Sequence, residues 1–224
     1  MSIAYNRSIV TSGLVACLDA GNPRSYSGSG TTITDVSGQG ATGTINGTIS
    51  FVSAGQASYW NFATSSDSNF ISSTLSQSYV DCTFVLYPDF NANNGSAIAG
   101  LISNSSPAAP TDKSLRFQGV NGTGPWTLAD RNPGDANDWA YPTATTYYVN
   151  GTVSNILVSG WNIFGGYRTN QSTFPLSFAY YLGSSGYPAR SFQGRIAVAL
   201  LYNRQLSATE QLQNFNALRG RYGV

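Results

Sequence analysis

The chain has 224 residues, of which 41% are hydrophobic and 13% aromatic, while only 9% are charged. This amount of apolar material suits the interior of one large β-sandwich and excludes a disordered chain. The net charge of +1 comes without a basic run, which excludes nucleic acid and anionic lipid as partners.

Short runs rich in Val, Ile, Thr, Tyr and Phe alternate with glycine-, serine- and asparagine-rich segments along the whole chain. This pattern predicts an all-β fold, because no helical segments separate the runs as they would in a parallel sheet. The expected strands lie near 13–20, 47–53, 57–63, 80–89, 97–103, 114–120, 145–151, 155–160, 162–168, 178–184 and 195–203. We expect residues 1–12 to form an N-terminal arm and residues 13–224 to form a single domain.

One helix is predicted at the end of the chain. Ser207 is the expected N-cap, and Glu210 three residues later completes a capping box. Gly220 is the expected C-terminal stop. An apolar stripe at helical spacing should face the sandwich, and it consists of Leu212, Phe215 and Leu218.

Several residues are expected to be structural. Cys17 and Cys82 lie in apolar runs and should be buried free thiols, with a disulfide as the less favoured alternative. Trp60 and Trp161 are predicted to lie in the core. The Asn-Gly pair at Asn150 is typical of a tight turn, as are the pairs at 46 and 121.

A long segment, residues 121–143, is predicted to be a functional loop, because long loops on a sandwich carry function more often than they merely connect strands. A sugar site needs a flat aromatic ring beside a few amide or carboxylate groups. The candidate carbohydrate-binding residues in and beside this loop are Trp126, Trp139, Tyr141, Asn132, Asp135 and Asn137.

The residue types argue against catalysis. No histidine is present, which excludes a Ser-His-Asp triad, a Cys-His pair and the usual zinc sites. The chain has a single glutamate, whereas retaining glycosidases need two closely spaced carboxylates. Asp130, Asp135 and Asp138 are candidates for a calcium site, but solvated turn carboxylates are the favoured interpretation. We therefore predict no enzyme activity, no catalytic residues, no metal and no cofactor.

Two segments carry a resemblance to a known family. Residues 9–48, IVTSGLVACLDAGNPRSYSGSGTTITDVSGQGATGTINGT, and residues 192–223, FQGRIAVALLYNRQLSATEQLQNFNALRGRYG, resemble the opening and closing segments of concanavalin A-like lectin/glucanase (laminin-G-like) domains of tailed-phage structural proteins. The resemblance implies a two-sheet antiparallel jelly-roll sandwich with one C-terminal helix. Within the opening segment, Asp19 and Asp35 are interpreted as turn-fixing carboxylates, with Arg24 as a candidate partner.

The resemblance implies little about activity, because the same fold hosts lectins, glycosidases and inert structural modules. Our first hypothesis is a capsid decoration or cement protein of a tailed phage, bound to a capsid or other virion protein in multiple copies or as a homo-oligomer. The alternative is a carbohydrate-binding adhesion module for host surface glycans. The first residues lack the apolar core of a signal peptide, and no apolar run approaches a membrane span. We expect synthesis in the host cytoplasm, a place on the virion surface and no membrane partner.

Overall fold

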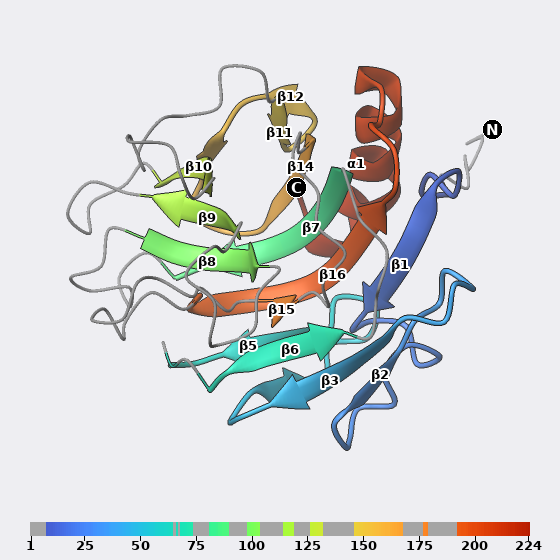
Figure 1. The fold of residues 1–224 in the computed structure, drawn as a ribbon, viewed down its shortest axis with the longest axis vertical. Helices are drawn as coiled ribbons and strands as arrows, with labels where there is room; N and C mark the ends of the chain where they lie inside the picture. The colour runs from blue at the N-terminus through green and yellow to red at the C-terminus, as the bar shows by residue number, and fades with distance from the viewer. Residues whose placement is uncertain are drawn as a thin grey trace.

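The chain folds into two antiparallel sheets and one C-terminal helix (Figure 1). The computed structural model describes residues 8–64, 66, 68–73, 81–89, 98–103, 114–118, 126–131, 146–167, 177–178 and 192–224. Four of its strands, those at 98–103, 114–118, 126–131 and 177–178, are described by their backbone alone.

Sheet A is centred on β16, the longest strand described, which pairs with β7 on one side. On the other side of β16, its first residues pair with β5 and its last residues pair with β1. The strands of sheet A are β1 (Leu14–Asp19), β4 (Ser50–Val52), β5 (Tyr59–Phe62), β7 (Asp81–Pro88), β11 (Tyr147–Val149), β12 (Thr152–Val153), β14 (Asn162–Tyr167) and β16 (Gly194–Tyr202).

Sheet B has the strand order β13-β10-β9-β8-β15-β6-β3-β2. Its strands are β2 (Thr32–Thr34), β3 (Thr42–Asn46), β6 (Phe70–Ser73), β8 (Ile98–Ser103), β9 (Ser114–Gln118), β10 (Trp126–Arg131), β13 (Ile156–Leu157) and β15 (Ser177–Phe178). The all-β class and the two-sheet architecture with one terminal helix are therefore confirmed.

Five of these strands were not predicted. Three of them, β2, β3 and β6, are short and rich in Thr, Ser and Gly, so their sequences look like turns until a neighbouring strand pairs with them. The expectation of an uninterrupted loop over 121–143 is wrong, because Trp126–Arg131 forms β10 between β9 and β13. The fifth, β12, is only two residues long.

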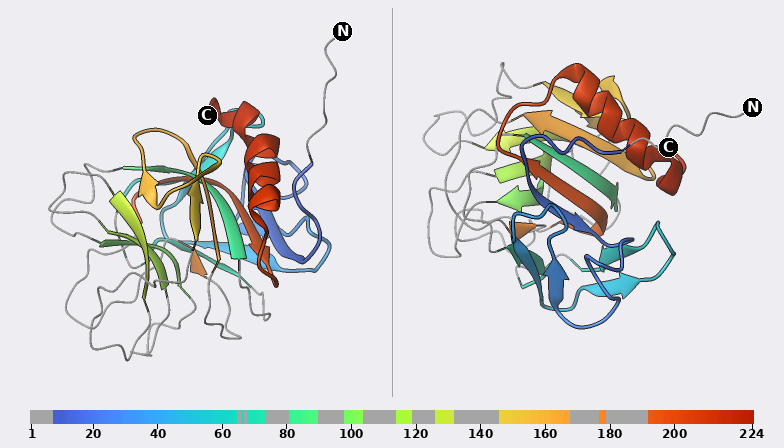
Figure 2. Two further views of the ribbon diagram at one scale, coloured as in Figure 1. Left: turned by 90° about the horizontal axis from the view of Figure 1, so that it is seen from above. Right: turned by 90° about the vertical axis from the view of Figure 1, so that its right-hand side faces the viewer.

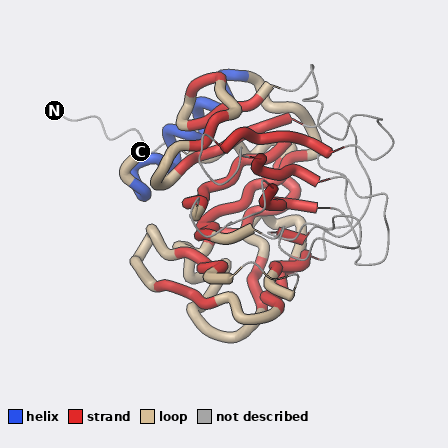
Figure 3. Tube along the Cα trace, turned by 90° about the vertical axis from the view of Figure 1, so that its left-hand side faces the viewer, coloured by secondary structure: helices blue, strands red, loops and turns tan. Residues whose placement is uncertain are grey.

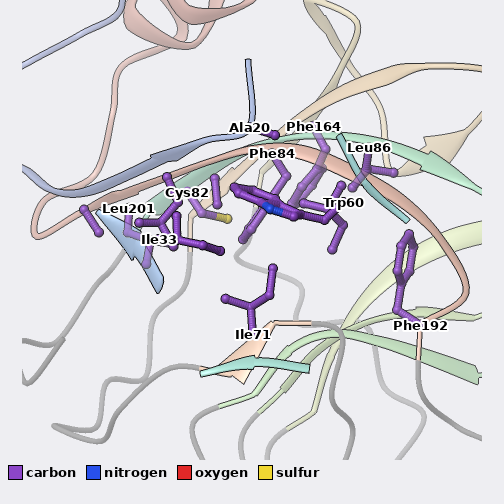
Figure 4. Packing of buried hydrophobic residues seen from close by; sticks show 14 of the residues in the cluster. Ala20, Ile33, Trp60, Ile71, Cys82, Phe84, Leu86, Phe164, Phe192 and Leu201 are labelled. Atoms are coloured by element: carbon purple, nitrogen blue, oxygen red, sulfur yellow. The ribbon is translucent and has the colours of Figure 1, made fainter. Parts of the chain in front are cut away.

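The main core lies between the two sheets (Figure 4). Alternate residues of sheet A point into it, and the largest fully buried side chains include Trp60, Phe84 and Phe164. Ile71 of β6 faces them from sheet B. Burying residues of this size contributes roughly 1.5–3 kcal/mol each, which makes this layer the principal source of stability.

Helix α1 (Ala208–Tyr222) covers the opposite face of sheet A (Figure 2). The predicted capping box is confirmed, because the Ser207 hydroxyl accepts from the Glu210 N–H and the Glu210 carboxylate accepts from the Ser207 N–H. The predicted stop at Gly220 is wrong. The helix continues to Tyr222 and ends at Gly223, whose left-handed conformation places its N–H on the Arg219 carbonyl.

The stripe predicted for the helix is also partly wrong. Leu218 is buried and Phe215 is half-buried, but Leu212 is 45% exposed. Two polar residues, Gln211 and Asn214, are buried in its place. Polar groups occupy these positions because the sheet face beneath the helix presents polar groups too, so hydrogen bonds between the layers replace apolar packing.

Asn214 is the centre of one such set of hydrogen bonds. Its amide N–H groups donate to Thr83 Oγ1 (3.0 Å) and to the Tyr202 hydroxyl (3.0 Å), while its amide oxygen accepts from the Val10 N–H (2.8 Å). The Tyr202 hydroxyl donates to the Val10 carbonyl. This network fastens the described end of the N-terminal segment, residues 8–12, to both the helix and the sheet.

Other sequence expectations are settled by local geometry. Cys17 and Cys82 are both buried and do not form a disulfide with each other, as predicted. Asn150 and Gly151 both adopt positive φ, 50° and 78°, in the turn between β11 and β12, which confirms the Asn-Gly prediction.

Strands make up about half of the described chain, with the helix at one side of them (Figure 3).

Candidate functional site

The residues predicted to bind carbohydrate fall largely outside the described part of the chain. Trp126 is the first residue of β10, where its backbone pairs with Leu157 of β13. The other five residues lie outside the described residues: Trp139, Tyr141, Asn132, Asp135 and Asn137. Asp130 belongs to β10, and Asp135 and Asp138 also lie outside the described residues.

A different group of aromatic residues gathers on the outer face of sheet A. We call Tyr59, Tyr87, Trp161 and Arg195 the aromatic platform. They come from four neighbouring segments: β5, β7, the residue just before β14, and β16. All four are half-buried, so part of each side chain remains accessible to solvent.

The register of sheet A places these residues together. Arg195 lies directly opposite Tyr87 in the β16–β7 pair. Asn162 lies opposite Leu86 in the β14–β7 pair, so the preceding residue, Trp161, comes level with Tyr87. Because alternate residues of a strand share a face, Tyr87 points away from the core into which Leu86 is packed.

The rings contact one another in edge-on arrangements. The Trp161 ring centroid lies 5.6 Å from that of Tyr59 and 5.7 Å from that of Tyr87, with interplanar angles of 65° and 89°. Trp161 also lies 4.9 Å from the ring of Tyr222, the last residue of α1, in a tilted arrangement with an interplanar angle of 50°. Edge-to-face contacts of this kind are worth about 0.5–1.5 kcal/mol beyond the area that they bury. The array is therefore held in place before any ligand binds.

A tight turn fixes the backbone of Trp161. The fully buried amide of Asn162 accepts from the Val158 N–H (3.0 Å) and donates to the carbonyls of Val158 and Gly160 (both 2.9 Å). Gly160 has a φ of +107°, a conformation that a residue with a side chain rarely adopts. The short segment before β14 is thereby folded back, which sets Trp161 on the outer face of the sheet.

The prediction that Trp60 and Trp161 both lie in the core is right for Trp60 alone. Trp60 is fully buried between the sheets, whereas Trp161 is half-buried on the opposite face. Trp161 lies where α1 ends, and its ring contacts Tyr222, the last residue of the helix, which leaves Trp161 half-buried.

The end of the helix beside the platform is fixed by an ion pair. Arg221 donates through both terminal nitrogens to the Asp19 carboxylate (2.8 and 2.7 Å) and through Nε to the Gln56 carbonyl (2.9 Å). Asp19 also accepts from the Gly21 N–H, and Asp35 accepts from the Ser37 N–H, so the turn-fixing roles are confirmed.

The suggested pairing of these carboxylates with Arg24 is wrong. Asp19 pairs with Arg221, 202 residues away in sequence, because the end of α1 lies beside the end of β1. Arg24 is exposed and uses its backbone N–H to bond Asn22.

Reactive groups in the described chain are held in structural roles. Burial raises the pKa of the Cys17 thiol to about 12, so that thiol stays protonated at neutral pH. Glu210 receives two hydrogen bonds from Arg204, which lower its pKa to about 2. Within the described ranges, no three His, Cys, Asp or Glu side chains are grouped as metal ligands would be. No helix in that part of the chain is long and apolar enough to cross a membrane.

Two of the cavities next to described residues suit a sugar less well than the platform does. One of about 430 Å³ is lined by Tyr26 and Phe51, but Tyr26 is 5% exposed and edge-on to Phe51, so its ring face is closed to a ligand. Another, of about 310 Å³, adjoins Asp81 and the start of α1, where the carboxylate is already hydrogen-bonded to protein donors.

Comparison with known proteins shows which solved structures have a similar fold. No family model matches the chain, and no curated protein matches its sequence. Among solved structures, the receptor-binding domain of botulinum neurotoxin type G superposes with a TM-score of 0.52 at 15% identity, over 92% of this chain and 51% of that chain. Trypanosoma rangeli sialidase in complex with the inhibitor DANA superposes with a TM-score of 0.54 at 13% identity, over 93% and 33%.

A third structure is similar in extent as well as in fold. Domain 4 of AbnA, an extracellular arabinanase of Geobacillus stearothermophilus solved in complex with arabinotriose, superposes with a TM-score of 0.53 at 14% identity, over 90% of this chain and 97% of that chain. These likenesses establish the fold. The chain spans about half of the neurotoxin domain and a third of the sialidase.

Proposed function

We propose that the protein is a glycan-binding module and that the aromatic platform is its binding surface. The observation that carries this proposal is the gathering of three half-exposed aromatic rings, Tyr59, Tyr87 and Trp161, on one face of a rigid sheet. The apolar face of a sugar ring packs on such rings, while polar groups at the rim orient its hydroxyls.

The rigidity of the platform supports this role. Its residues lie on or next to strands of one sheet, and Trp161 is held by the Asn162 turn and by Tyr222. A binding surface that is already ordered loses little conformational entropy when the ligand binds. The fold is compatible with the proposal, since the similar domain 4 of AbnA was solved with arabinotriose. The role on a virus particle, the oligomeric state and the loop residues predicted from sequence stay predictions.

The test is a glycan-array screen followed by calorimetry on the best ligand. Changing Trp161→Ala should weaken binding by about tenfold or more, because one aromatic contact is worth about 0.5–1.5 kcal/mol in addition to the area that it buries. Tyr87→Ala should act in the same direction. Leu212→Ala is the matched control, because it removes an exposed apolar side chain of α1 and should leave affinity unchanged.

A second comparison separates the platform from the loop predicted by sequence. The double variant Trp126→Ala with Trp139→Ala should bind as the wild type does if the platform is the site. The melting temperature of every variant is recorded, so that a loss of folding is distinguished from a loss of binding. Unchanged affinity in Trp161→Ala and Tyr87→Ala, with loss in the double variant, would move the site to the loop. Failure to bind any glycan would contradict the proposed function.

A further inference from the structure

Arg195 occupies the middle of the aromatic platform. Its guanidinium carbon lies 5.1 Å from the ring centroid of Tyr59 and 4.6 Å from that of Tyr87. Both distances are within the range of a cation–π contact. Stacking of this kind uses the flat faces of the guanidinium group, whereas its N–H groups point outward in its plane and need acceptors of their own.

No acceptor for those N–H groups lies among the residues that the structure describes. Arg195 forms no hydrogen bond and no ion pair with any residue in the described ranges. The other half-buried arginines of that part of the chain differ in this respect. Arg204 holds Glu210 through two hydrogen bonds, and Arg221 holds Asp19 in the same way. Arg195 is thus half-buried, and no described carboxylate forms an ion pair with its guanidinium group.

The charges around Arg195 leave it as the cation of the platform. Arg221, which stacks on Tyr222 next to Trp161, is neutralised by Asp19. Asp89 follows Tyr87 by two residues, and its backbone N–H donates to the Gln193 carbonyl. It is not an ion-pair partner of Arg195. A positive charge fixed between aromatic rings is suited to an anion that arrives with the ligand.

We propose that the aromatic platform selects glycans carrying an acidic sugar residue, whose carboxylate or sulfate group binds the Arg195 guanidinium. This inference rests on the proposed function, because the same aromatic rings would pack against the sugar while the Arg195 guanidinium binds its acidic group. A planar, forked donor matches a carboxylate with two parallel hydrogen bonds, and these are among the stronger hydrogen bonds in proteins. A neutral sugar hydroxyl would satisfy the same N–H groups less well.

The experiment compares matched pairs of ligands. Oligogalacturonates are tested against their methyl esters, and sulfated lactose is tested against lactose, by calorimetry at low and at physiological salt. The wild type should prefer the acidic member of at least one pair by about tenfold or more, the value of one charge-assisted hydrogen bond. The pair that shows the preference identifies a carboxylate or a sulfate as the anion.

Three variants assign the preference to Arg195. Arg195→Gln should reduce the acidic-to-neutral affinity ratio to about one and remove the dependence of that ratio on salt. Arg195→Lys keeps the charge and the alkyl stem but lacks the planar fork, so it should retain part of the preference. Arg24→Gln, which removes an equal charge from an exposed site, should behave as the wild type does.

The outcomes separate this inference from the proposed function. If the wild type binds both members of every pair equally well, or if Arg195→Gln and Arg195→Lys both keep the full preference, the inference is overturned and glycan binding by the platform stands. If no glycan binds, both are overturned. A preference that falls in Arg195→Gln and survives in Arg24→Gln supports the inference.

Discussion

Asp81 should make the stability of the protein depend on pH. This carboxyl group is 1% exposed beneath the start of α1. Its Oδ1 accepts from the Cys82 N–H (2.8 Å) and from Gln211 Nε2 (2.7 Å), and its Oδ2 accepts from the Leu206 N–H (2.8 Å). Burial raises its pKa from 3.8 to about 7, although the three donors act in the opposite direction.

The direction in which pH changes the free energy of unfolding depends on whether the folded or the unfolded chain holds the Asp81 proton more tightly. Below about pH 4 the Asp81 carboxyl is protonated in both the folded and the unfolded chain. Between about pH 4 and about pH 7 the unfolded chain loses this proton and the folded chain keeps it, so the free energy of unfolding falls as the pH rises. Each pKa unit is worth 1.36 kcal/mol, so a rise of roughly three units gives a loss of about 4 kcal/mol, complete slightly above pH 7.

The pH window is otherwise favourable for this measurement. The chain has no histidine, and Glu210, whose pKa is lowered to about 2, changes its contribution only below its unfolded value of 4.5. Its stabilising effect is present above that pH and is lost as the pH falls toward 2. Among the described groups with a shifted pKa, Asp81 is the one that titrates between pH 5 and 7, and comparison with Asp81→Asn assigns a decline in stability there to it.

The assay is urea denaturation of the wild type and of Asp81→Asn at half-unit steps between about pH 4.5 and 8. The Asn side chain cannot ionise, so its curve should lack the decline that the wild type shows. At low pH the two stabilities should come closest, because the protonated Asp81 carboxyl, like the Asn amide, pairs one carbonyl oxygen with one hydrogen-bearing group. Two curves that stay parallel over the whole range would refute a titration of Asp81 in this window.

Two further predictions concern the interface between the helix and sheet A, and thermal or urea unfolding checks both. Leu218→Ala should cost about 2–5 kcal/mol, whereas Leu212→Ala should change stability by less than about 0.5 kcal/mol, and equal losses would contradict the orientation of the helix. Asn214→Ala should cost about 1–3 kcal/mol for each buried partner left without a hydrogen bond, while Gln213→Ala, on the exposed side, should cost little.

Local chemistry is sufficient to predict many features of this protein. Short runs rich in Val, Ile, Thr, Tyr and Phe, bounded by turn-forming residues, indicate the strands β1, β5, β7 and β16. The capping box at Ser207 and the Asn150-Gly151 turn are equally local, since each depends on residues within one turn of the chain. Local sequence patterns do not predict β2, β3 or β6, because their short polar sequences form strands only when neighbouring strands pair with them.

The candidate site depended on tertiary structure for a different reason. Sequence indicates that Trp161 is a large aromatic residue at the start of a strand, but not which of the two faces of sheet A it occupies. That face is set by the register of β14 against β7 and by the Asn162 turn, and its accessibility is set by where α1 ends. Register also brings Arg195 opposite Tyr87, and these residues are 108 positions apart in the chain.

The sequence alone determined the all-β class, through the spacing of its apolar runs and turn residues, and the lack of histidine, because these properties depend on which residues are present and in what order. The tertiary structure decided which polar groups are buried under the helix and which of the described half-buried arginines forms no ion pair with a described carboxylate. Asp19 pairs with Arg221 because β1 and the end of α1 come together in space, whereas Arg195 lies against the rings of Tyr59 and Tyr87. Residues so distant in sequence become ion-pair partners only when the packing of the whole fold brings their side chains together.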